Sequence, residues 1–150
     1  MATTVVEPAF VDTNVLVYAN QSHAARHAQA LALLREADEA GAALAISGQV
    51  LREYLAVVTR PQAGSAPLPM AAALDRVALF TRRFHLLQDG PIVRARLHDL
   101  LAVHPGGGRQ VHDANIVATM LAHRVRRLLT FNTADFRRFR PLIEIAQDEA

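Results

Sequence analysis

The sequence predicts an α/β fold in which a central parallel sheet of four or five strands is covered by helices on both faces. Short apolar runs alternate with longer segments of helical periodicity, and this alternation is typical of parallel strands joined by crossover helices. With 150 residues, 51% of them hydrophobic, the chain is long enough for one buried core and short for two. We therefore expect residues 1–150 to form a single domain.

Each expected strand is a short apolar run, and most expected helices begin or end at a recognisable signal. Strands are expected at residues 9–11, 44–46, 84–87, 128–131 and 142–145. Helices are expected at residues 15–18, 22–39, 50–59, 70–83, 89–103 and 111–125, with a loop at residues 61–69 that gives no clue to a substrate. Asp12 and Ser47 are suited to cap the helices that follow them. Gly41 fits the end of one helix and Pro91 the first turn of another.

The composition limits the cross-links, metal ligands and partners that the chain can have. The chain has no cysteine, so disulfides and thiolate ligands are excluded, and a metal would be held by oxygen or imidazole. The sequence lacks an apolar run of about 18 residues and a basic, signal-like N-terminus, so we expect a cytoplasmic protein without a membrane span. All 16 basic side chains are arginine and the formal charge is only +2, which permits a nucleic-acid partner without requiring one.

Four carboxylates stand at informative positions. Asp12 directly follows the first expected strand, and Asp135 comes just after the fourth. Glu53 borders the apolar stripe of its helix, whereas Asp113 lies in the middle of such a stripe, where an unpaired carboxylate is costly to bury. Each of them also has a purely structural interpretation, as a helix cap, a first-turn acid or a solvated side chain. The ordered set therefore carries more weight than any single member.

A doubly wound sheet can bring these acids together. The carboxyl end of the first strand, the helix after the second and the loop after the fourth can meet in one crevice. Carboxylates gathered there repel one another unless a divalent cation neutralises them, and hard oxygen ligands favour Mg²⁺ or Mn²⁺. One or two such ions can activate water against a phosphodiester. The expected reaction is metal-dependent hydrolysis of a nucleic-acid backbone.

Three segments carry a resemblance to a known family. They are FVDTNVL at residues 10–16, HDANIVA at residues 112–118 and TFNTADF at residues 130–136. Glu53, within QVLREY at residues 49–54, matches the remaining acid of the same family. Together, over residues 10–139, they resemble the PIN-domain family and specifically its VapC-type toxins.

The resemblance implies a PIN-like (Rossmann-like) α/β/α sandwich and an endoribonuclease that depends on Mg²⁺ or Mn²⁺. It also implies a homodimer that forms the toxin half of a toxin–antitoxin pair and is inhibited by a VapB-type antitoxin protein. The implied catalytic and metal-binding residues are Asp12, Glu53, Asp113 and Asp135. The residues implied to support them by hydrogen bonds are Thr13, Asn14, Thr130 and Asn132. The RNA substrate itself is left open.

Several basic side chains have open interpretations. The arginines that could contact RNA phosphates, or simply lie on solvated helix faces, are Arg82, Arg83, Arg94, Arg96 and Arg124. His23 and His27 have the i, i+4 spacing of zinc ligands but lack the glutamate of the metalloprotease motif. His112 could assist proton transfer or merely pack.

Two other functions stay open at this point. The acids could be structural in a catalytically inactive module that binds RNA or a protein partner. Alternatively, Asp12 could be the nucleophile of a haloacid-dehalogenase-like phosphatase, although Asn14 occupies the place of that family's second aspartate. Cleavage by the wild type, lost on substitution of Asp12 or Asp113, distinguishes the nuclease from both.

Overall fold

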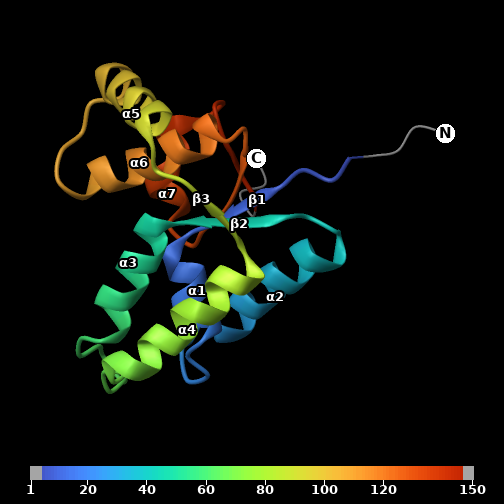
Figure 1. The fold of residues 1–150 in the computed structure, drawn as a ribbon, viewed down its shortest axis with the longest axis vertical. Helices are drawn as coiled ribbons and strands as arrows, with labels where there is room; N and C mark the ends of the chain where they lie inside the picture. Colours follow the sequence, from blue (N-terminus) through green and yellow to red (C-terminus); the bar gives the residue numbers. More distant parts are fainter. Residues whose placement is uncertain (1–4, 147–150) are drawn as a thin grey trace.

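Five strands form one parallel sheet in the middle of the computed structural model, which describes residues 5–146 (Figure 1). The strands are β1 (Ala9–Val11), β2 (Leu44–Ser47), β3 (His85–Leu87), β4 (Arg127–Leu129) and β5 (Glu144–Ile145). Their order in the sheet is β3-β2-β1-β4-β5, and each neighbouring pair is parallel. The chain builds β2 and β3 on one side of β1 and then β4 and β5 on the other. The strand order therefore switches between β1 and β4, and ligands of doubly wound sheets bind at the carboxyl ends beside such a switch.

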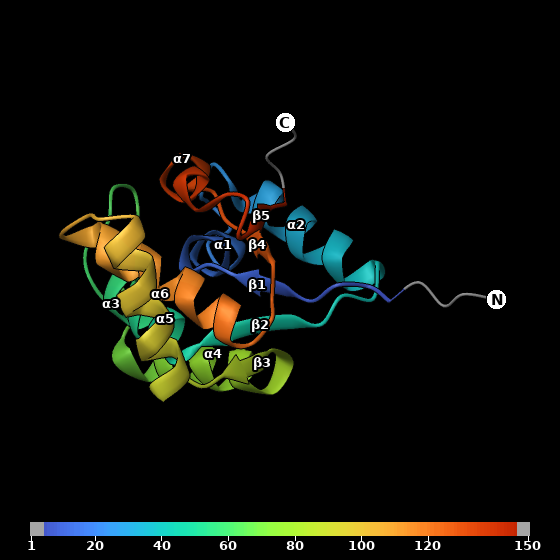
Figure 2. The same cartoon turned by 90° about the horizontal axis from the view of Figure 1, so that it is seen from above.

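Helices cover both faces of the sheet. The longer ones are α1 (Thr13–Ala19), α2 (His27–Glu39), α3 (Gly48–Val58), α4 (Met70–Arg83), α5 (Pro91–Val103) and α6 (Arg109–Ala122). The short ones are α7 (Thr133–Phe136) and the 3-10 turn η1 (Arg137–Phe139). Helices α1 to α4 lie below the sheet in Figure 1, and α5, α6 and α7 lie above it. Figure 2, seen from above, looks onto the sheet and shows its strands side by side. The predicted α/β/α fold is confirmed.

The core explains why the central strands are so apolar. All three residues of β1 are fully buried, because a central parallel strand has helices against both of its faces. The largest fully buried side chains include Tyr54 of α3, Phe136 of α7 and Phe139 of η1. Edge-to-face packing of Tyr54 on Phe80, with ring centroids 4.9 Å apart, joins α3 to α4. Within residues 5–146, the helices are all too short or too polar to cross a membrane.

Some element boundaries differ from the predicted ones, each for a local reason. Helix α2 begins at His27 rather than at residue 22, because residues 21–26 form turns whose side chains have no buried face to pack. His23 therefore lies outside α2, and the i, i+4 argument for a zinc pair with His27 does not apply. Helix α6 begins two residues early, at Arg109, because Gly108 makes a sharp turn with φ of 60°. Ser47 stands at the N-cap position of α3, but its hydroxyl makes no capping hydrogen bond.

Candidate functional site

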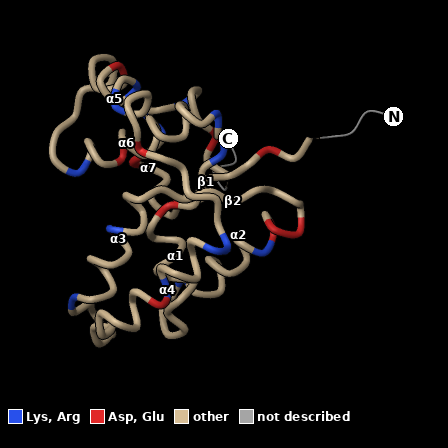
Figure 3. Tube along the Cα trace, in the orientation of Figure 1, with Lys and Arg blue, Asp and Glu red and all other residues tan. Residues whose placement is uncertain are grey.

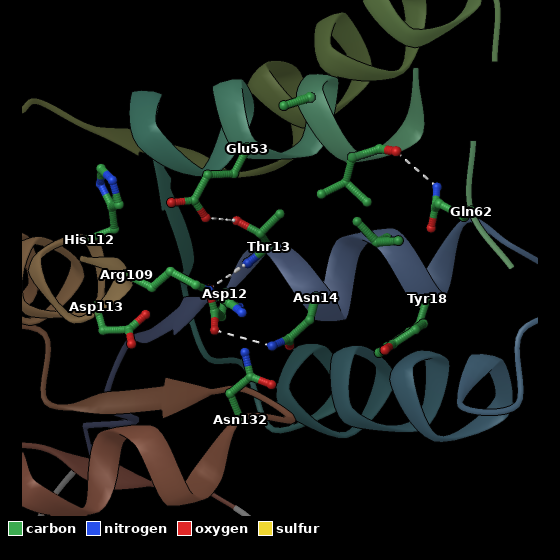
Figure 4. A pocket seen from close by; sticks show the side chains of 13 residues that line it. Asp12, Thr13, Asn14, Tyr18, Glu53, Gln62, Arg109, His112, Asp113 and Asn132 are labelled. Atoms are coloured by element: carbon green, nitrogen blue, oxygen red, sulfur yellow. Dashed lines mark hydrogen bonds between the residues drawn. The ribbon is translucent and has the colours of Figure 1, made fainter. Parts of the chain in front are cut away.

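A pocket of about 340 Å³ opens at the carboxyl end of β1, beside the switch in strand order (Figure 4). Its walls come from α1, α3 and α6, from the loop after α3 and from the segment after β4. The lining residues are Asp12, Thr13, Asn14, Val17, Tyr18, Glu53, Ala56, Val57, Gln62, Arg109, His112, Asp113 and Asn132. Three of the four predicted acids, from three separate segments, thus face one hollow. Asp135 is exposed on α7 and does not line the pocket, because Phe136 takes the buried side of that short turn.

Asp12 is the most constrained of the acids. It caps α1, as predicted, with Oδ1 accepting a hydrogen bond of 2.8 Å from the backbone N–H of Thr13. Its Oδ2 accepts from the hydroxyl of Thr130 at 2.7 Å and from Nδ2 of Asn14 at 3.3 Å. Only 5% of the residue is exposed. The carboxylate is therefore buried and fixed in orientation by three donors, which come from α1 and from the end of β4.

Asn14 and Thr130 tie the two strands at the switch point together. Nδ2 of Asn14 also reaches the Thr130 hydroxyl at 3.3 Å, and its Oδ1 accepts from the backbone N–H of Phe131 at 3.0 Å. The Thr130 hydroxyl further accepts from the backbone N–H of Asn132 at 3.0 Å. Asn132 thus contributes its backbone to this network, while its side chain lines the pocket without a hydrogen bond to an acid of the described chain.

Glu53 faces the pocket from α3 and is held at both oxygens. Oε2 accepts from the hydroxyl of Thr13 at 2.8 Å, and Oε1 accepts from Nε2 of Gln49 at 2.8 Å. Thr13 therefore contacts two acids at once, through its backbone to Asp12 and through its side chain to Glu53. Its single position on the first turn of α1 fixes how far apart these two carboxylates lie.

A chain of hydrogen bonds that the sequence did not indicate supports Glu53 from the side away from Thr13. Besides Glu53, the buried Gln49 donates to the carbonyl of His112 at 2.9 Å, which links α3 to α6. Its Oε1 accepts from Nδ2 of Asn115 at 2.8 Å, and the same nitrogen donates to Asp89 at 3.0 Å. The spacing of Gln49, one helical turn before Glu53, could have indicated the first link. The links to Asn115 and Asp89 bring together residues far apart in sequence, so spacing gives no sign of them.

Asp113 lies opposite Glu53 on α6 and is half-buried, with its pKa raised above the ordinary value. The largest cause is desolvation, followed by repulsion from the carboxylates of Asp135 and Glu53, while Arg109 and Arg138 act in the opposite direction. Asp135 is thus close enough to act on Asp113 although it lies outside the pocket lining. Among residues 5–146, no arginine forms an ion pair with Asp113, Asp12 or Glu53.

Burial raises the pKa of Asp12 to about 6 from its ordinary value of 3.8, with further contributions from Glu53 and Asp113. The hydrogen bonds from Thr130 and Thr13 oppose this shift without cancelling it. The three pocket acids therefore act on one another electrostatically, and among residues 5–146 no basic side chain forms an ion pair with them. Such a set of carboxylates is an incomplete charge arrangement that a cation can complete.

The chemistry of the donors fits a hard divalent cation. Three carboxylates with hydroxyl and amide oxygens beside them are the ligand types that Mg²⁺ and Mn²⁺ prefer. In the arrangement described for residues 5–146, however, no three histidine, aspartate or glutamate side chains stand close enough together to hold one ion. The donor types thus fit a hard divalent metal ion.

The basic residues are placed differently from the predicted set. None of Arg82, Arg83, Arg94, Arg96 and Arg124 lines the pocket. The arginine that does is Arg109, one turn before Asp113 on α6, a spacing that could have indicated it. Arginines are spread over several elements instead of gathering in one patch (Figure 3). His112 lines the pocket with an exposed side chain, which leaves its ring accessible there.

An open parallel sheet with one buried and two partly buried carboxylates beside its switch point defines an α/β protein suited to bind a cation and a polar ligand at one pocket. The chain belongs to the PIN-domain family, whose model matches residues 9–141. The resemblance noted in the sequence is thereby confirmed, and the matched range includes all four predicted acids.

Named relatives and solved structures agree with this assignment. The chain is 31% identical over 132 residues to Ribonuclease VapC24 of Mycobacterium tuberculosis, covering 86% of this chain and 89% of the relative. It is 32% identical over 134 residues to Ribonuclease VapC48 of the same species, covering 85% and 89%. VapC20 of that species, described as a sarcin-ricin loop cleaving toxin, superposes with a TM-score of 0.64 at 17% identity over 85% of this chain and 92% of that one. VapBC2 from Rickettsia felis, bound to a DNA fragment from its promoter, gives a TM-score of 0.62 at 21% identity over 90% and 94%. At these identities the two structures show a shared fold.

The raised pKa of Asp12 predicts a specific pH dependence of stability in the absence of divalent ions. Between pH values of about 4 and about 6 the folded state binds more protons at Asp12 than the unfolded state, so the free energy of unfolding falls as pH rises. The loss amounts to about 3 kcal/mol and levels off above pH of about 6. Asp12→Asn does not titrate, so its urea-denaturation profile between pH of about 4 and 8 should lack this component. Equal pH slopes for both proteins would show that the Asp12 carboxylate is not destabilised by burial.

Proposed function

We propose that the chain is a Mg²⁺- or Mn²⁺-dependent endoribonuclease that hydrolyses RNA phosphodiester bonds and acts as the toxin of a VapBC-type toxin–antitoxin pair. The observation that carries the proposal is the gathering of Asp12, Glu53 and Asp113 in one pocket without an arginine partner at close range. Membership of the PIN-domain family and similarity to two proteins named ribonucleases support the reaction type.

In this proposal Asp12, Glu53 and Asp113 hold the cation, and Asp135 adds negative charge next to Asp113. A bound divalent ion would supply an activated water and would stabilise the charge that develops on the leaving oxygen. Thr130, Asn14 and Thr13 keep Asp12 ionisable and oriented through the hydrogen bonds described above, and Gln49 with Thr13 does the same for Glu53. The protein thus fixes the orientation of Asp12 and Glu53 before an ion binds.

Two further pocket residues have roles toward the RNA. Arg109 extends from the first turn of α6 into the pocket wall, where its guanidinium can contact a phosphate beside the acids. His112 lies between Arg109 and Asp113 in sequence and presents an exposed ring to the same wall. Its imidazole can hand a proton to the leaving oxygen. The five arginines predicted from the sequence, which do not include Arg109, would contact phosphates only further along the RNA.

The partners follow from the same comparison. Similar solved structures include toxin–antitoxin complexes, among them one from Klebsiella pneumoniae, which supports a VapB-type antitoxin protein as the inhibitor of this chain. Several large apolar side chains are exposed and available for protein contacts, notably Leu74 and Leu79 on α4 and Ile92 on α5. We infer a cytoplasmic homodimer that is held inactive by its antitoxin.

The phosphatase alternative lacks its second catalytic group. Asn14 occupies that position, and both ends of its amide are engaged, by Asp12 and Thr130 at the nitrogen and by Phe131 at the oxygen. An amide that is fixed in this way cannot serve as the acid or base. The inactive-module alternative is tested directly by the cleavage experiment.

Purified protein should cut single-stranded RNA in the presence of Mn²⁺ or Mg²⁺ and not in the presence of EDTA. Asp12→Asn and Asp113→Asn should each slow cleavage by about 100-fold or more, because each removes a carboxylate from the reacting centre. Sequencing of the RNA ends measures both rate and position. The matched control is Asp99→Asn, a substitution of a 75% exposed aspartate on α5, which should cut at the wild-type rate. Undiminished cleavage by folded Asp113→Asn would rule out the proposed site.

Cation binding should be visible without any RNA. Mn²⁺ at about 100 times its dissociation constant should stabilise the wild type by about 2.7 kcal/mol and raise its melting temperature accordingly. Asp113→Asn should lose most of this shift, while Asp99→Asn should keep it. Equal shifts in all three proteins would place the ion at another site.

Expression of the chain without its antitoxin should arrest bacterial growth. Asp113→Ala should relieve the arrest while the protein still folds and forms a dimer, because the substitution removes a pocket acid and leaves the core untouched. Colony counts after induction, with circular dichroism and size-exclusion chromatography of the purified variant, measure both parts. Continued arrest by a folded Asp113→Ala protein would argue against toxicity through this pocket.

A further inference from the structure

The pocket has an apolar end that the acids do not use. Beyond Asp12 and Glu53 its walls are formed by Val17 and Tyr18 of α1 and by Ala56 and Val57 of α3, and Gln62 lies at the far end. Figure 4 shows Tyr18 and Gln62 on the side of the pocket opposite His112 and Asp113. We call Val17, Tyr18, Ala56, Val57 and Gln62 the base slot.

Helix geometry explains why the slot adjoins the acids. Val17 follows Thr13, and Val57 follows Glu53, by four residues, so each lies about one helical turn, or about 5.4 Å, further along its helix. Because α1 packs against α3, the two polar turns face each other and the two apolar turns do so next to them. The result is one continuous hollow with a charged half and an apolar half.

The Tyr18 ring packs against the core with part of its surface exposed. It packs edge-to-face on Phe131, with ring centroids 5.6 Å apart, and the guanidinium of Arg26 lies 5.1 Å from the Phe131 centroid. Its backbone carbonyl is bound to Nδ1 of His27 at 2.8 Å. The residue is nevertheless only half-buried, and it lines the slot. A positioned but partly exposed aromatic ring is a stacking surface.

Gln62 brings a polar group to the apolar end. Its Nε2 donates to the carbonyl of Val57 at 2.9 Å, which fixes the amide against α3. Its Oε1 accepts no hydrogen bond from residues 5–146, so the slot carries one oriented acceptor. The residue belongs to the loop at 61–69, whose sequence by itself gives no clue to a substrate.

We propose that the base slot binds one unpaired nucleobase of the RNA next to the phosphodiester that is cut. The proposal rests on the proposed nuclease function, because the phosphodiester must lie at the acids for the neighbouring base to reach the slot. Tyr18, Val17 and Val57 contact the faces of the base, and Gln62 Oε1 accepts a hydrogen bond from an N–H on its edge. Since single-stranded RNA is recognised through stacked bases and their edges, the slot makes cleavage selective at one position.

A nucleobase suits the slot better than a protein side chain does. The slot opens directly onto the acids, and a base is joined to the reacting phosphate by a single sugar. Its ring has two apolar faces and a polar edge, which matches two apolar walls with one acceptor at the end. A pocket of about 340 Å³ has room for a base as well as for the reacting phosphate.

The test uses three variants and two readouts. Gln62→Ala removes the acceptor, Tyr18→Leu removes the ring, and Ala56→Trp fills the slot from an exposed position where folding is not at risk. Ala78→Trp, at an exposed position on α4, is the matched control. The first readout is the base composition around the cut sites in a random-sequence RNA pool. The second is fluorescence anisotropy of a labelled RNA pentamer in the presence of EDTA, where the proposed metal-dependent cleavage does not occur.

Wild type and Ala78→Trp should show the same base preference at one fixed position beside the cut. Gln62→Ala should flatten that preference, and Tyr18→Leu and Ala56→Trp should weaken pentamer binding by about tenfold. All three variants should keep the Mn²⁺-induced rise in melting temperature, since the acids are unchanged.

Unchanged preference and unchanged pentamer binding in the three variants would overturn the base slot, while cleavage by the wild type would leave the nuclease function standing. Pentamer binding that depends on Tyr18 and Gln62, without cleavage of any RNA, would support the slot and overturn the nuclease function. If Ala56→Trp cuts RNA normally but escapes inhibition by the antitoxin, the slot takes a protein side chain and the proposal is wrong.

Discussion

The structure depends on an aspartate that is buried at the end of its central strand without a counter-charge. Asp12 follows a strand with no exposed residue. Its carboxylate is stabilised by hydrogen bonds that it accepts from Thr13, Asn14 and Thr130. These donors do not offset the desolvation, since its pKa stays raised, and the nearby Glu53 and Asp113 raise it further. A fold optimised for stability alone would place an apolar or paired residue there. The uncompensated cost of burying this carboxylate indicates that Asp12 has a role in the pocket rather than in the stability of the core.

The fold and the site are connected through the ends of two neighbouring strands. Asp12 follows β1 and Thr130 follows β4, and Asn14 bonds to both, so the register between these strands also sets the geometry of the acid. Glu53 is placed by the packing of α3 on α1 and by the buried Gln49, which reaches across to α6. Asp12 and Glu53 are thus each positioned by contacts between elements distant in sequence.

The strands and three of the pocket acids could be predicted from the sequence. The helix boundaries and several supporting residues could not, for physical reasons. Alternating apolar runs predicted the strands, and Asp12, Glu53 and Asp113 were found from their positions beside apolar stripes and strand ends. The start of helix α2 was predicted five residues too early, because helix propensity alone cannot show that residues 21–26 lack a surface to pack on. The exposed position of Asp135 depends on which side of a four-residue turn Phe136 fills. The contributions of Asn115 and Gln62 depend on which segments become neighbours, and a single sequence does not reveal this.

If the acids form a metal site, the pocket binds a divalent cation that is added to the protein. If the acids are purely structural, it does not. The most direct measurement is the anomalous scattering of a crystal soaked in Mn²⁺. The account predicts an anomalous peak in the pocket lined by Asp12, Glu53 and Asp113, and its disappearance from crystals of Asp113→Asn. A pocket without a peak at saturating Mn²⁺, or an ion bound only elsewhere on the surface, would contradict it.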